Sequence, residues 1–223
     1  MFVGHIGAGL AIGSVERRVN VGAFVAAALL LGIVLWSFVL LGHESVAIPA
    51  DFARTHQPEF DFPFSHGLAA AIAWSTLAGA FAWIASARLP ALRVRVALLA
   101  AAAVFSHWLL DVLVHRPEMP VAGADSAMLG LALWDSMAVA LAVEAALVVA
   151  GLLLYVRDSG LARRRTVALA ALVLVTLAFT VAGMTIAPPP PSAQAMAATS
   201  LVTIAVVVAL IGWLARRPPA ATR

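Results

Sequence analysis

The chain has 223 residues, of which 63% are hydrophobic and only 11% are charged. A typical soluble domain has about 25% charged residues, so this composition excludes an ordinary soluble protein and indicates an integral membrane protein. The net charge of +3 is no sign of nucleic-acid binding, because the arginines lie in loops between apolar segments and follow membrane topology. The absence of cysteine excludes disulfides and thiolate metal sites.

The first apolar segment, residues 2–16, is too short to cross the hydrocarbon layer, which needs about 20 helical residues. It is rich in glycine and carries His5 near its middle. We expect either a re-entrant helix that reaches half-way into the bilayer or an interfacial helix.

Six longer apolar segments follow, and the fourth is long enough to tilt or to extend beyond the membrane. They cover residues 21–42, 66–87, 96–115, 127–156, 166–187 and 199–215. The sequence therefore predicts an all-α integral membrane protein, a bundle of about six transmembrane helices with the short N-terminal helix added. We expect one polytopic membrane domain over residues 1–223.

The arginines predict the orientation of this bundle. Arg54 and Arg116 fall in loops on one side, and every other arginine falls in loops or ends on the opposite side. Because positive residues favour the cytoplasmic side, we expect both termini in the cytoplasm. The predicted location is a bacterial-type inner (plasma) membrane.

A polar stripe lies inside the third span. His107, Asp111 and His115 are spaced by four residues, and each such step rotates by about 40° on an α-helix. The three side chains therefore share one helix face. Ionisable groups at membrane depth are costly unless paired, so a metal, a polar partner helix or a water-filled cavity must satisfy them.

Histidine and carboxylate ligands suit zinc, manganese or iron. His5 and Glu144 lie at nearly the same predicted depth as His107, since each is twelve or thirteen residues from an arginine at the inner boundary. We predict a divalent metal, with zinc first, in an outward-facing cavity. The predicted metal ligands are His5, His66, His107, Asp111 and His115, and the residues predicted to orient or deprotonate water are Asp135 and Glu144.

Four short motifs together resemble a known family. They are Gly4-His5, Phe-Pro-x-Ser-His at 62–66, Ser-His-x3-Asp-x3-His-Arg-Pro at 106–117, and Gly-Leu-x-Leu-Trp-Asp-Ser at 130–136 followed by Glu144. The set is similar to the membrane-bound metal-dependent hydrolases called YdjM-like, in a branch often labelled as uncharacterised membrane proteins or permeases.

The resemblance covers about residues 1–157, and residues 158–223 would add two C-terminal helices. It implies a helical bundle, a divalent-metal site that uses His66, His107, Asp111 and His115, and hydrolase activity. The family commonly has an acid near the end of the first full span, whereas residues 31–36 here read Leu-Gly-Ile-Val-Leu-Trp.

Three functions fit these features. The first is a metal-dependent hydrolase acting on a lipid or other amphipathic ester or phosphoester. The second is a transporter or permease that uses intramembrane His, Asp and Glu side chains as an ion or proton pathway. The third is a structural subunit or oligomer joined through small-residue faces such as Ala69, Ala70 and Ala73. The bilayer is the expected partner in each.

Overall fold

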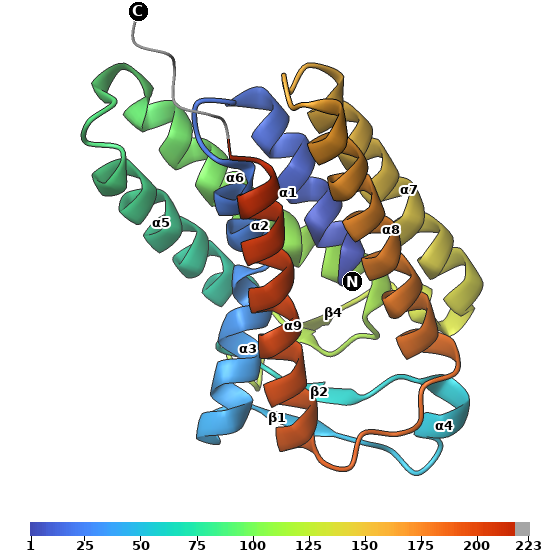
Figure 1. The fold of residues 1–223 in the computed structure, drawn as a ribbon. Coiled ribbons are helices and arrows are strands. Elements are labelled where there is room, and N and C mark those ends of the chain that lie inside the picture. The colour runs from blue at the N-terminus through green and yellow to red at the C-terminus, as the bar shows by residue number, and fades with distance from the viewer. Residues whose placement is uncertain (217–223) are drawn as a thin grey trace, which may run out of the picture.

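A computed structural model describes residues 1–216 and shows a bundle of apolar helices (Figure 1). Within these residues, five helices are long and apolar enough to cross a membrane, and a bent pair makes a sixth span. The predicted all-α membrane fold is confirmed. The five are α5 (Leu68–Ala85), α6 (Arg93–Val114), α7 (Met137–Arg157), α8 (Arg163–Thr185) and α9 (Ala193–Leu214).

The bent pair occupies the first predicted span, residues 21–42. It consists of α2 (Val21–Ala28) and α3 (Leu30–Leu41), whose axes differ by 52°. The helix breaks at Leu29, so a proline or glycine at the break is not the cause. Tertiary packing remains as the cause, since Leu29 is buried in the core cluster that α2 shares with α1, α7, α8 and α9, whereas Leu31, two residues later, belongs to a second cluster.

The short N-terminal segment forms α1 (Val3–Val15), which lies inside the bundle and not on its surface. Close packing against α7 requires glycine: a Cβ at Gly7 would lie 2.5 Å from the carbonyl oxygen of Leu147, and one at Gly151 would overlap the carbonyl of Gly7. The first turn of α1 is consequently held near the middle of the bundle (Figure 1). Of the two predicted placements, the structure selects the inserted helix.

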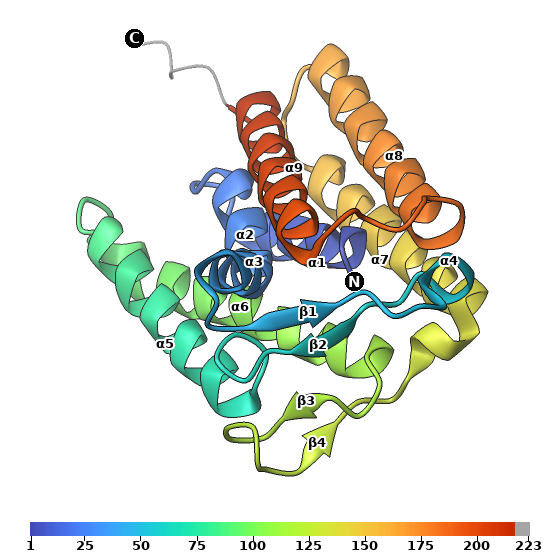
Figure 2. The same cartoon turned by 90° about the horizontal axis from the view of Figure 1, so that it is seen from below.

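The two ends of the bundle differ. At one end Arg17, Arg95 and Arg165 bond to backbone carbonyls of neighbouring elements, and we call this the arginine-rich end. The other is the sheet end (Figure 2). It carries two antiparallel strand pairs and two short helices: β1 (Ser45–Ala47), α4 (Phe52–Thr55), β2 (Glu59–Asp61), β3 (Met119–Pro120), β4 (Met128–Leu129) and η2 (Leu133–Ser136). A third short helix, η1 (Pro90–Leu92), lies at the arginine-rich end.

The start of the fourth span is a correction. Residues 127–132 were expected to be helical, but they contain β4 and an irregular turn, and the span begins with η2 at Leu133. Ala132 has a left-handed backbone, with φ of 56°, which ends any helix there. Within this stretch Leu129 packs against the core cluster that contains Met119, whereas Met128 and Leu131 are exposed.

The C-terminal helices α8 and α9 share one core cluster with α1, α2 and α7. Leu169 and Val173 of α8 meet Val207 and Ile211 of α9 in the half nearer the arginine-rich end. Toward the sheet end the two helices diverge, as both views show (Figures 1 and 2). Residues of both helices toward this end line an internal cavity.

Candidate metal centre

Four histidines and one aspartate meet in the interior of the bundle. Their side chains come from α1, from the turn before α5, from α6 and from the residue that follows α6. All five residues are at most 4% exposed: His5, His66, His107, Asp111 and His115. The structure therefore brings together every residue that the sequence predicted as a metal ligand.

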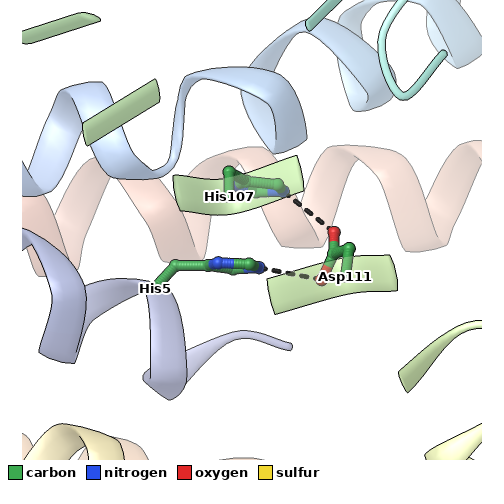
Figure 3. A group of neighbouring side chains, drawn as sticks. All are labelled: His5, His107 and Asp111. Carbon is green, nitrogen blue, oxygen red and sulfur yellow. Dashed lines mark hydrogen bonds and ion pairs between the residues drawn. The ribbon is translucent and has the colours of Figure 1, made fainter. Parts of the chain in front are cut away.

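The Nε2 atoms of these histidines surround the carboxylate of Asp111. Oδ2 lies 3.1 Å from Nε2 of His107, 3.3 Å from that of His66 and 4.0 Å from that of His115. Oδ1 lies 3.1 Å from Nε2 of His5 (Figure 3). The rings of His5 and His107 stack with centroids 3.6 Å apart, and both direct the edge that carries Nε2 toward Asp111.

The opposite ring nitrogens are held by other groups. Nδ1 of His107 lies 2.7 Å from the carbonyl oxygen of Ala28, at the end of α2 beside the break. Nδ1 of His115 lies 2.6 Å from Oε1 of Glu118. A carbonyl oxygen and an ionised carboxylate can only accept, so both Nδ1 atoms donate and both Nε2 atoms face the centre.

His66 is oriented in the same way by its neighbours. Its Nδ1 lies 2.8 Å from Oγ of Ser65, and the backbone N–H groups of Phe64 and Ser65 both donate to Oε1 of Glu44. Burial raises the pKa of Glu44 and lowers that of His66 to about 4. His66 is therefore a neutral imidazole at neutral pH, the form that binds metals.

Two of the ring nitrogens approach each other and the same carboxylate oxygen. Nε2 of His107 lies 3.2 Å from Nε2 of His66 and 3.1 Å from Oδ2 of Asp111. Nε2 of His107 donates to Asp111 when it carries a proton, and in a neutral ring protonated on Nδ1 it offers a lone pair to a cation. The amino group of Met1 already places a positive charge beside the cluster, since it donates to Oδ1 of Asp111 over 2.7 Å.

The separations also fit a metal ion. Ligand atoms bound tetrahedrally to zinc at 2.0–2.1 Å are about 3.3 Å from one another. The triangle of His66 Nε2, His107 Nε2 and Asp111 Oδ2 has sides of 3.2, 3.1 and 3.3 Å, which matches one face of that tetrahedron. His5, His107 and Asp111 likewise offer ligand atoms within 4.8 Å of one another.

The two predicted water-activating residues lie in different places. Oε2 of Glu144 accepts the backbone N–H groups of Val3 and Gly4, so Glu144 caps the first turn of α1 at the wall of the centre. Asp135 is exposed at the sheet end and pairs with Arg116 at 2.9 Å. The structure does not bring Asp135 to the histidine cluster.

Sequence reasoning missed the groups that orient the histidines. Ala28 acts through its backbone carbonyl, so the identity of its side chain gives no sign of this contact. Glu118 follows His115 by three residues, a spacing that could have indicated the pair. Gly32 also went unnoticed: it lies beside the cluster, and a Cβ there would lie 3.4 Å from Cε1 of His107.

A cavity of about 320 Å³ adjoins the cluster. Its walls are mainly aromatic, aliphatic and methionine side chains, with threonine and serine hydroxyls contributed by α8 and α9. Binding sites for small ligands have this size and this mixture of apolar walls and few polar groups. The cavity connects the histidine cluster with the divergent ends of α8 and α9.

No family model, curated protein or solved structure matches this chain. The resemblance to the YdjM-like hydrolases therefore stays a prediction, and the centre must be interpreted from its own chemistry.

Proposed function

We propose that the protein is a membrane-embedded metal-dependent hydrolase that acts on a lipid or other amphipathic ester or phosphoester. The observation that carries the proposal is the convergence of Nε2 of His66 and Nε2 of His107 on the carboxylate of Asp111. A buried set of imidazole and carboxylate groups can hold a divalent cation, and this donor set suits zinc, with manganese or iron as other candidates.

In this proposal His66, His107, His5 and Asp111 hold the metal ion, and His115 lies close enough to complete the set. Ala28, Ser65 and Glu118 fix the rings so that the Nε2 atoms face inward. A divalent ion there would supply Lewis-acid activation of water and of the ester oxygen.

The adjoining cavity would hold the substrate. Hydrolysis joins the water oxygen to the acyl carbon or the phosphorus, breaks the ester bond, and passes the water proton to the leaving alcohol. Of the two carboxylates predicted to take part, Glu144 lines the cavity and Asp135 does not. We therefore assign the proton acceptor to Glu144, whose position is fixed by the N–H groups of α1.

Orientation follows from charge. If the arginine-rich end faces the cytoplasm, as the distribution of positive residues favours, the sheet end and the cavity face outward. We propose a plasma membrane of bacterial type as the location.

Hydrolysis of membrane lipids tests the function directly. Purified protein in phosphatidylcholine and phosphatidylglycerol vesicles should release fatty acid or a phosphorylated headgroup, and a strong chelator should stop the release. Asp111→Asn should abolish it, whereas Asp125→Asn, on the exposed β3–β4 connection, should leave it unchanged. Release that persists in chelator and in Asp111→Asn would reject the proposal. Ion flux without hydrolysis would favour a transporter.

A further inference from the structure

The cavity beside the histidine cluster opens on the side of the bundle. Among the lining residues of the described chain 1–216, only Phe179 of α8 and Thr199 of α9 are exposed. A residue that is exposed and also lines a cavity marks its mouth. Because α8 and α9 are both membrane-spanning helices, this mouth faces lipid.

Helix geometry gives the depth of the mouth. Phe179 lies six residues before the end of α8 at Thr185, and Thr199 lies six residues after the start of α9 at Ala193. At 1.5 Å per residue, both are about 9 Å from the sheet end of their helices. The hydrocarbon layer is about 30 Å thick, so the mouth lies at the depth of acyl chains.

The direction toward water is covered. Phe52, His56 and Pro58 line the cavity at the sheet end and are buried. Nε2 of His56 lies 3.1 Å from the carbonyl oxygen of Ala187, and the neighbouring Gln57 donates to the carbonyl oxygen of Trp134 over 2.8 Å. These bonds tie the β1–β2 connection to the α8–α9 linker and to η2, so the open route is the lateral one.

We propose that a membrane lipid enters the cavity between Phe179 and Thr199, with an acyl chain between α8 and α9 and its ester group toward Asp111. The walls support this occupant: Trp36, Met184 and Met196 are apolar contacts for a chain. The assignment of the reaction rests on the proposed hydrolase function, whereas the access route rests on the mouth alone.

Gly183 offers a way to close this mouth. It lies one turn after Phe179 on α8, lines the cavity, and a Cβ there would meet no described atom within 4 Å. Gly183→Trp should therefore fill the opening without disturbing the backbone. Val175→Trp is the matched control, because Val175 lies on the same helix, is 66% exposed and is outside the cavity lining.

Photo-crosslinking tests the route. The protein and both variants are placed in phosphatidylcholine and phosphatidylglycerol vesicles that contain a phosphatidylcholine with a diazirine on one acyl chain, and adducts are mapped by peptide mass spectrometry. We expect adducts on Trp36 and Met196 in the wild type and in Val175→Trp, and their loss in Gly183→Trp. Adducts on Val202, 63% exposed on α9, should persist in all three.

Adducts confined to exposed positions such as Val202, or interior adducts that survive Gly183→Trp, would overturn the lateral route. Adducts concentrated on Phe52 and Pro58 would also overturn it, in favour of access through the sheet end.

Metal content measured on the same samples distinguishes the lateral route from the proposed hydrolase function. Interior adducts without metal would support the route and reject the hydrolase, and metal without interior adducts would reject the route alone.

Discussion

Nε2 of His107 lies 3.1 Å from Oδ2 of Asp111, one turn further along α6, while Nδ1 of the same ring lies 2.7 Å from the carbonyl oxygen of Ala28. The carbonyl can only accept, so Nδ1 donates to it and Nε2 is left facing the carboxylate. This relationship orients the ring so that a neutral His107 could bind a cation together with Asp111.

The contact of Glu118 with His115 predicts a loss of metal affinity in a variant of Glu118. A carboxylate that accepts from the far nitrogen of a metal-binding histidine typically contributes about 10–100-fold to affinity. We expect Glu118→Ala to weaken binding by that amount if His115 is a ligand. Competition with a fluorescent zinc chelator measures it, and Asp125→Ala on the same outer connection is the control. Equal affinities in both variants would remove His115 from the ligand set.

The capping role of Glu144 predicts different effects for two substitutions. Glu144→Ala leaves the buried N–H groups of Val3 and Gly4 without their acceptor, which costs about 1–3 kcal/mol for an unsatisfied buried group. Glu144→Gln keeps an acceptor oxygen and should lower the melting temperature less. Thermal unfolding in detergent measures both. A larger loss in the glutamine variant would show that the negative charge, and not the cap, stabilises α1.

The contact between α1 and α7 predicts a steric effect at Gly7. A Cβ there would lie 2.5 Å from the backbone oxygen of Leu147, so Gly7→Ala must displace α1. Overpacking of this kind costs about 1–3 kcal/mol, and because α1 carries His5, metal retention should fall with stability. Gly183→Ala, a helical glycine with open space around it, should keep both properties. If Gly7→Ala keeps its full metal content, His5 is not needed to hold the metal ion.

The pairing of Glu16 predicts a pH dependence of stability. Hydrogen bonds from Arg18, together with the charge of Arg95, lower the pKa of Glu16 to about 2 from an ordinary 4.5. Because the folded-state pKa is depressed, the ionised group stabilises the protein above pH 4.5, and this contribution is lost as the pH falls toward 2.

In Glu16→Gln the melting temperature should therefore be lower than in the wild type at neutral pH, and the difference should shrink as the pH falls through this window. Glu59→Gln, an exposed carboxylate on β2, serves as the control. A difference that stays constant down to pH 2 would mean that the charge of Glu16 does not stabilise the fold.

The sequence predicted the helices and the residues that cluster in the interior because both depend on local signals. Apolar length indicated the spans, and the four-residue spacing of His107 and Asp111 placed them on one face. The bend at Leu29 could not be predicted, because leucine is an ordinary helix-forming residue and the break depends on how Leu29 and Leu31 pack into separate core clusters. That bend matters, since Ala28 beside it orients His107.

Asp135 illustrates the opposite case. Its Trp-Asp-Ser setting near an apolar span suggested a position at the site, but the backbone turn at Ala132 starts the helix later and leaves Asp135 beside Arg116. For α1, the sequence left a re-entrant and an interfacial helix open, and the contacts of Gly7 with Leu147 and Gly151 show that the helix packs inside the bundle.

The most direct test of the metal centre is elemental mass spectrometry on protein purified with a histidine-free tag and without added metal. The wild type and His43→Ala, a variant of an exposed loop histidine, should contain near-stoichiometric zinc, manganese or iron, and His107→Ala should contain none. Metal absent from the folded wild type, or retained equally in His107→Ala, would contradict the centre described here.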